Sequence, residues 1–158
     1  MDSTVIAKLD YGNILFNGLP NNTMDKLQRV QNTAARIITK TGRYEHITPS
    51  MIALHWLPVK HRVMYKVLLQ TFKALNNQSP FYIKDMLHPY KPQRELRSGN
   101  ATFLQVPKTK TGRYGDGCFL KSAPVLWNNL PEALRKMEAI GTFKRALKTY
   151  LFKQAYNL

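Results

Sequence analysis

The acidic residues are the first place to look for chemistry, because catalysis by paired carboxylates or by two metal ions needs several acids at one site. The chain has nine Asp and Glu residues in 158, and no two of them lie closer than six residues apart. Asp25 and Glu132 fall in the first turns of expected helices, where a negative charge stabilises the helix dipole. The acids therefore do not support a polymerase or nuclease metal site, and we expect no metal and no cofactor.

The histidines and the single cysteine add little to this. His55 and His61 flank a short turn that ends at Pro58, where packing or a hydrogen bond at a helix entry is the simplest interpretation. Cys118 cannot form an internal disulfide, and one thiol excludes zinc and iron–sulfur sites built from several cysteines. Cys118 also lacks the local signature of a catalytic nucleophile.

The basic residues are the dominant feature of the sequence. The chain carries 24 Lys and Arg against 9 Asp and Glu, a net charge of +15, with a pI of about 10.1. Residues 1–79 have 10 basic and 4 acidic groups and residues 80–158 have 14 and 5, so the charge is not a terminal tail. Because each neutralised phosphate releases condensed counterions, such an excess favours a polyanion as partner. We expect nucleic acid first and an anionic membrane surface second.

A basic turn at residues 108–114 could contact phosphates directly. Gly112 and Gly117 have the spacing of a P-loop, but Cys118-Phe119 stands where Lys-Ser/Thr is required. The lysines, hydroxyls and backbone N–H groups of 108–114 could instead hold backbone phosphates, and Tyr114 could stack on a base. A solvated hairpin tip is the alternative interpretation.

Helix signals show which elements must position these cations. Prolines at first-turn positions predict helix starts at 48–49, 58, 79–80 and 130–131. Capping residues predict helices over 23–40 and from 142 to about 155, and the first seventeen residues resemble one more helix. The segment 58–76 is apolar nearly all round, which is typical of the central helix of a bundle.

The 23–40 helix is expected to pack and to present cations at the same time. An apolar stripe recurs at three- and four-residue steps, through Met24, Leu27, Val30, Ala34, Ile37 and Ile38. About 120° away lie four basic residues that we expect to contact nucleic acid: Lys26, Arg29, Arg36 and Lys40.

The segment 88–121 changes in character. Prolines and glycines break the helical periodicity, and a hairpin pairing 101–106 with 118–121, or nearby residues, is the expectation. Its candidate phosphate and base contacts are Arg94, Arg97, Lys108, Lys110, Arg113 and Tyr114. The sequence thus predicts a mainly α fold, a small helical bundle, in three parts: a helical unit at 1–87, a basic irregular segment at 88–121 and a carboxy-terminal helical unit at 122–158.

Membrane insertion and secretion have no support in the sequence. No stretch approaches the roughly 18–20 apolar residues that a membrane span needs, and the amino end lacks a secretory signal. We therefore expect an intracellular chain, cytoplasmic or nuclear.

A series of short motifs resembles one known family along nearly the whole chain. In order, they are Leu9-Asp10-Tyr11-Gly12-Asn13, Gly18-Leu19-Pro20, the run from Lys26 to Arg36 (KLQRVQNTAAR), His46-Ile47-Thr48-Pro49, Leu54-His55-Trp56-Leu57-Pro58-Val59, Phe72-Lys73-Ala74-Leu75, Ser79-Pro80, Leu96-Arg97-Ser98, Val106-Pro107, the run from Ala123 to Pro131 (APVLWNNLP), Phe143-Lys144 with Leu147, and Leu151-Phe152. This series resembles the region downstream of the polymerase palm in reverse transcriptases of non-long-terminal-repeat (LINE-type) retrotransposons, of the jockey-like group.

The resemblance implies a region that binds nucleic acid but contains no polymerase active site. Family members join an apurinic-type endonuclease to a reverse transcriptase, and the part resembled here is the thumb-like and carboxy-terminal region that holds template and primer. The paired aspartates of the palm are missing, so the chain is not expected to polymerise by itself. It departs from the family pattern at Gly12, where cysteine is common, and at Gly117, where a basic residue is common. The start at Met1 suggests a truncated element copy or a retained host function.

Two other functions are compatible with the sequence. The chain could be a protein-interaction module that packs on the missing palm or on another chain, which an exposed apolar patch around residues 1–20 would favour. It could also bind anionic membranes through the terminal helix, but the apolar face of that helix is more simply explained by core packing.

Overall fold

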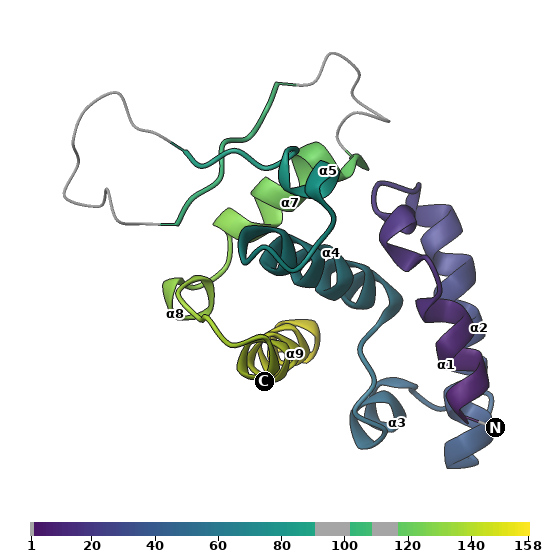
Figure 1. The fold of residues 1–158 in the computed structure, drawn as a ribbon. Coiled ribbons are helices and arrows are strands. Elements are labelled where there is room, and N and C mark those ends of the chain that lie inside the picture. The colour runs from purple at the N-terminus through teal and green to yellow at the C-terminus, as the bar shows by residue number, and fades with distance from the viewer. Residues whose placement is uncertain (1, 91–101, 109–116) are drawn as a thin grey trace. The chain divides into compact units, whose positions relative to one another are not determined.

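The computed structural model describes residues 2–90, 102–108 and 117–158, and within these ranges the chain is mainly helical, as predicted (Figure 1). The helices, in chain order, are α1 (Asp2–Asp10), the short 3-10 helix η1 (Asn13–Phe16), α2 (Asn21–Thr39), α3 (Thr48–Ala53), α4 (Val59–Leu75), α5 (Phe81–Lys84), α7 (Phe119–Asn128), α8 (Glu132–Arg135) and α9 (Ile140–Tyr156).

Prolines set several of the helix starts. Pro49 lies in the first turn of α3, and Pro80 and Pro131 immediately precede α5 and α8 with extended backbone. Proline is tolerated there because the first helical turn needs no N–H donor. The α9 helix begins two residues before the expected Thr142 cap. Asp25 lies beyond the first turn of α2, whereas Glu132 does occupy the first turn of α8.

The chain forms two compact units. Unit 1 comprises Met1–Tyr65 and Lys148–Leu158, and unit 2 comprises Lys66–Leu147. These boundaries differ from the three segments expected at 1–87, 88–121 and 122–158. Both boundaries, at Tyr65–Lys66 and Leu147–Lys148, fall inside long helices, α4 and α9, and no proline, glycine or loop lies next to either one. Loop signals therefore could not have located them.

In unit 1, α2 buries a different face from the predicted stripe. Gln31 and Ala35 are fully buried, whereas Val30 and Ile37 are 52% and 69% exposed. The Gln31 side-chain amide donates a hydrogen bond to the Leu57 carbonyl oxygen at 2.8 Å. This buried polar contact turns the glutamine inward, so the prediction that all six apolar residues share the packed face was wrong for Val30 and Ile37.

The remaining elements of unit 1 are joined by polar and aromatic contacts. The Arg62 guanidinium forms a two-pronged ion pair with Asp10, at 2.9 and 2.5 Å, which ties α1 to α4. The Tyr156 hydroxyl donates to the Trp56 carbonyl oxygen at 2.6 Å, and the His55 ring lies 6.0 Å from that of Phe152. His55 is exposed, so this ring contact covers only part of its side chain.

In unit 2 the core is built on aromatic rings. The Phe72 and Phe143 rings stack with centroids 4.1 Å apart, and Trp127 lies against Phe143 at 6.1 Å. Trp127 is 2% exposed, as expected of a core residue. Its indole N–H donates to the Thr102 carbonyl oxygen at 2.9 Å, which satisfies its one donor.

The extended segment 102–105 pairs with residues other than those predicted. Leu104 forms an antiparallel bridge with Pro89, and the Tyr90 N–H donates to Phe103 O at 2.9 Å. On the other side, the Asn128 side chain bonds both the N–H and the carbonyl of Leu104, at 2.9 and 2.8 Å. Residues 119–121 begin α7, so the predicted pairing of 101–106 with 118–121 was wrong.

Candidate nucleic-acid interface

Half of the predicted contact residues lie in the described part of the chain. Lys26, Arg29, Arg36 and Lys40 lie on α2 or at its end, and Lys108 follows the paired segment 102–105. The other five predicted residues lie outside the described residues: Arg94, Arg97, Lys110, Arg113 and Tyr114.

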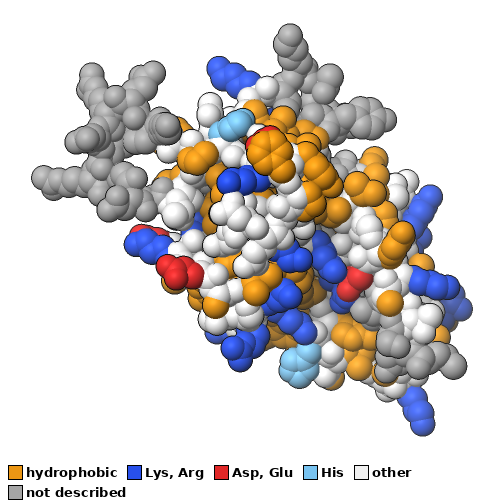
Figure 2. Space-filling model, viewed as in Figure 1, with side chains coloured by type: hydrophobic (Ala, Val, Ile, Leu, Met, Phe, Trp, Pro, Cys, Tyr) orange, Lys and Arg blue, Asp and Glu red, His pale blue; other side chains and the backbone are white. Residues whose placement is uncertain are grey.

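Three of the α2 cations form an exposed face. Lys26, Arg29 and Lys40 are all exposed, and none of them forms an ion pair within the described residues. At about 100° per residue they fall within roughly 60° of one another around the helix. Figure 2 shows Lys and Arg side chains along the outer edge of the region that α1 and α2 occupy, with few Asp or Glu side chains beside them. We call Lys26, Arg29 and Lys40 the α2 basic face.

A network of side-chain amides explains why this face points outward. Gln28 donates to Gln31 and Asn32, at 3.1 and 2.8 Å, and its own oxygen accepts the backbone N–H of Val59 at 2.9 Å. Because Val59 opens α4, its N–H has no partner within that helix, and Gln28 satisfies it. Together with the bond from Gln31 to Leu57, this network fixes the rotation of α2 and so leaves its cations in solvent.

Arg36 has a different role from the other α2 cations. Its side chain is half-buried, and its guanidinium donates to the carbonyl oxygens of Gly42 and Glu45, the latter at 2.8 Å. The Arg36 carbonyl also accepts the N–H groups of Lys40 and Thr41. Arg36 therefore holds the chain that leaves α2, a structural role that helical phase alone did not predict.

Hydroxyl groups complete the end of α2. Thr39 donates to the Ala35 carbonyl at 2.9 Å and lies 2.6 Å from the Thr41 hydroxyl, which lies 2.8 Å from that of Ser50. Lys40, with a left-handed φ of 53°, lies between the two threonines. Its backbone position is thus set by fixed neighbours although its side chain is exposed.

Elsewhere in the described residues, Arg62 and Lys136 lie beside acidic partners. Arg62 pairs with Asp10, and burial, together with the charge of that carboxylate, raises the pKa of Tyr65. Lys136 lies 2.6 Å from Glu132, and its hydrogen bond and charge lower the pKa of that solvent-exposed carboxyl. Neither pair involves the α2 basic face.

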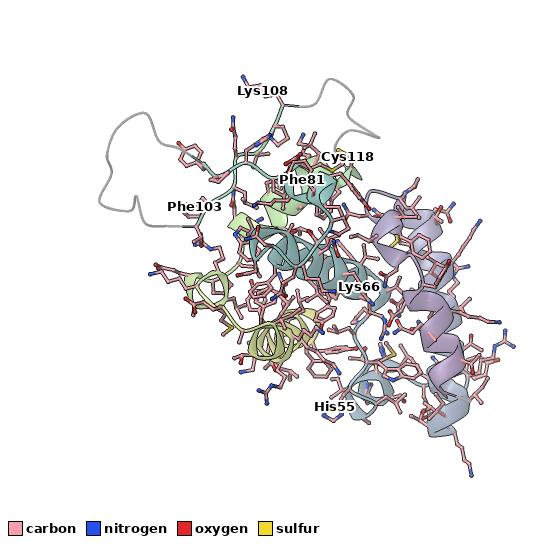
Figure 3. All side chains as sticks on the ribbon, viewed as in Figure 1. His55, Lys66, Phe81, Phe103, Lys108 and Cys118 are labelled. Carbon is pink, nitrogen blue, oxygen red and sulfur yellow. The ribbon has the colours of Figure 1, made fainter. Side chains whose placement is uncertain are left out.

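Lys108 lies at the end of a firmly held segment. The Arg135 guanidinium lies over the Phe103 ring, 4.1 Å from its centroid, and donates to the Leu130 carbonyl at 3.1 Å. With the bonds from Asn128 to Leu104, these contacts fix the chain that leads to Lys108. Figure 3 shows the Lys108 side chain pointing away from the ribbon.

Exposed apolar side chains are also present in unit 1. Tyr11 is 87% exposed and Leu15 is 80% exposed, and both lie where α1 gives way to η1. By contrast, α9 buries Phe143, Leu147 and Leu151 completely. The face that a membrane-binding terminal helix would need to keep free is therefore packed in the core.

The described residues hold no group of three or more His, Cys, Asp or Glu side chains that could bind a metal ion. Within the same residues, no helix is both long enough and apolar enough to cross a membrane. Comparisons with protein-family models, with curated proteins and with solved structures found no match to this chain.

Proposed function

We propose that this chain is a non-catalytic, thumb-like and carboxy-terminal portion of a non-long-terminal-repeat retrotransposon reverse transcriptase, and that it binds RNA or an RNA–DNA template–primer through backbone phosphates. The observation that carries the proposal is the α2 basic face, three exposed cations on one helix of a chain with a net charge of +15. The order of the motifs along the chain supplies the class of polyanion.

The contacts of α2 explain what the residues of the motif from Lys26 to Arg36 do. Within the run from Lys26 to Arg36, the amides of Gln28 and Gln31 hold the start of α4, while Lys26 and Arg29 face solvent. One short stretch of sequence therefore specifies both packing and charge display. Such a division supports a helix that is anchored on one side and binds a ligand on the other.

The length of the basic face suits a nucleic-acid strand. Residues 26 to 40 span about 21 Å along α2 at 1.5 Å per residue. A strand of duplex carries a phosphate roughly every 3.4 Å along its axis, so about six phosphates lie within that length. Lysine and arginine side chains along this length can contact backbone phosphates, and such contacts hold a duplex without reading its sequence.

Binding measured against salt concentration tests the proposal. Filter binding of an RNA–DNA duplex between 50 and 200 mM salt should give a log–log slope of about −5, as expected for roughly six neutralised phosphates. A flat slope, or no binding at 50 mM salt, would contradict the proposal.

A second candidate function rests on the exposed Tyr11 and Leu15. These side chains could pack on a polymerase palm or on another chain if they form part of one contiguous apolar patch, which is typical of interaction surfaces. Light scattering at increasing protein concentration tests this candidate for self-association. The wild type should associate, and the variant Tyr11→Ser with Leu15→Ser should remain monomeric at the same concentrations.

A further inference from the structure

Two adjacent aromatic side chains on α5 are largely exposed to solvent. Phe81 is 76% exposed and Tyr82 is 64% exposed, and Met86 on the following turn is 40% exposed. We call these three residues the α5 surface. Figure 2 shows hydrophobic side chains at the surface over α5, and Figure 3 labels Phe81 there.

The backbone beneath the α5 surface is fixed. Leu87 is buried, and its N–H donates to the Lys84 carbonyl at 2.9 Å, while the Asp85 N–H donates to Phe81 O at 3.0 Å. The Lys84 ammonium also donates to the Asn77 side-chain oxygen at 2.7 Å, which ties α5 to the turn after α4. The two rings are thus held in solvent by a segment that other residues anchor.

Further rings and cations continue along the adjoining chain. Tyr90, 54% exposed, lies in the stretch that pairs with 102–105, and exposed Lys108 follows that pairing. Asn77, the partner of Lys84, is neutral, so the charge of that lysine is not cancelled. Unit 2 as a whole has 14 Lys and Arg against five Asp and Glu.

We infer that the α5 surface is a stacking site for the bases of single-stranded nucleic acid, in addition to the phosphate contacts of α2. The inference rests on the proposed function and extends it from duplex to unpaired template. Aromatic rings beside cations suit single strands because unpaired bases stack on the rings while the cations attract the phosphates. The bases inside a duplex cannot use these rings, since they are already stacked on one another.

The positive charge of unit 2 favours single-stranded nucleic acid over an apolar protein surface as the ligand of the α5 surface. An apolar protein surface would gain from the exposed rings but nothing from the surplus of positive charge. A single strand gains from both, because every nucleotide supplies one flat base and one phosphate.

Leucine substitutions separate stacking from simple apolar contact. The variant Phe81→Leu with Tyr82→Leu keeps apolar side chains but removes both rings, and the matched variant Phe81→Tyr with Tyr82→Phe keeps both rings. Tyr44→Leu is a control at an aromatic residue in unit 1 that is 97% exposed. Fluorescence polarisation of the full chain would use labelled 12-nucleotide oligo-U and a blunt RNA–DNA duplex of equal length.

We expect the double leucine variant to bind oligo-U about tenfold or more weakly and to bind the duplex as the wild type does. The ring-keeping variant and Tyr44→Leu should match the wild type on both probes. The loss should persist at higher salt, because stacking releases no counterions.

The outcomes separate the inference from the proposed function. If the double leucine variant binds oligo-U as tightly as the wild type while the duplex still binds with a steep salt slope, the inference is overturned and the proposed function stands. If the wild type binds neither probe, the proposed function is overturned and the inference fails with it.

Discussion

At the scale of single residues, Arg29 and Arg36 carry the same charge on the same helix but have different surroundings. Arg29 is exposed and has no acidic partner in the described residues, whereas Arg36 donates to two carbonyl oxygens in the chain that follows α2. Charge-assisted hydrogen bonds of this kind contribute to stability, and an exposed unpaired cation contributes little.

The two arginines should therefore respond differently to the same substitution. Arg36→Gln should lower the free energy of unfolding by about 1–2 kcal/mol, since two charge-assisted bonds are lost in a partly exposed site. Arg29→Gln should change it by less than about 0.5 kcal/mol and instead weaken nucleic-acid binding. Urea unfolding measures the first quantity, and equal destabilisation by both variants would contradict this assignment.

The Tyr156 hydroxyl offers a second test at a single residue. Burial raises the pKa of Tyr156 to about 12, from about 10 in the unfolded chain. The folded chain thus holds this proton more tightly, so the contribution to stability is present below pH 10 and is lost as the pH rises toward 12. The bond to Trp56 O at 2.6 Å is lost with the hydroxyl.

Tyr156→Phe should lower the free energy of unfolding by about 1 kcal/mol at pH 7. The difference between wild type and variant should shrink between pH 10 and 12, because only the wild type carries this ionisable group. Thermal unfolding of both proteins across that range measures the effect, and a difference independent of pH would refute the argument.

At the scale of elements, the orientation of α2 depends on its buried Gln31. Gln31 is fully buried and donates to Leu57 O just before α4 begins. Loss of this donor leaves a buried carbonyl without a partner. The same contact determines which side of α2 presents its cations.

Gln31→Ala should lower the free energy of unfolding by about 1–3 kcal/mol. Thr33→Ala is a matched control on the exposed side of α2, where the hydroxyl bonds only to the Arg29 carbonyl of its own helix. This control should change stability by less than about 0.5 kcal/mol. A Gln31→Ala protein as stable as the control would show that the amide network does not orient α2.

Local signals predicted most of the helices but not their contacts. Pro49, Pro58, Pro80 and Pro131 mark helix starts because proline restricts the backbone at a first turn wherever it occurs. The buried side of α2 could not be predicted, because the partner of Gln31 lies 26 residues away in sequence. Sequence periodicity assigns polar residues to solvent, so a buried glutamine is misplaced unless its partner is known.

The sequence predicted the exposure of three candidate contact residues but not the structural contacts of the fourth residue on α2. Helical phase alone placed Lys26, Arg29 and Lys40 on one exposed face, since that needs only the rotation per residue. The structural role of Arg36 depends on the path of the chain through Gly42 and Glu45, which periodicity does not contain. The exposure of Phe81 and Tyr82 was not predicted, because a four-residue helix is too short for periodicity to assign a buried face.

At the scale of the whole molecule, the positive charge belongs to both units. Unit 1 carries 10 Lys and Arg against four Asp and Glu, and unit 2 carries 14 against five. Neither unit alone accounts for the net charge of +15. Binding to a polyanion should therefore draw on several cations, of which the α2 basic face supplies a defined part.

The change in salt slope on neutralising that face tests the central claim most directly. Lys26→Gln with Arg29→Gln should reduce the magnitude of the log–log slope for an RNA–DNA duplex by about two, from about −5 to about −3, because each lost phosphate contact removes roughly one unit. Lys60→Gln, a change at an exposed lysine on α4 in the same unit, is the matched control and should leave the slope near −5. Equal slopes for the double variant and the control would contradict the account.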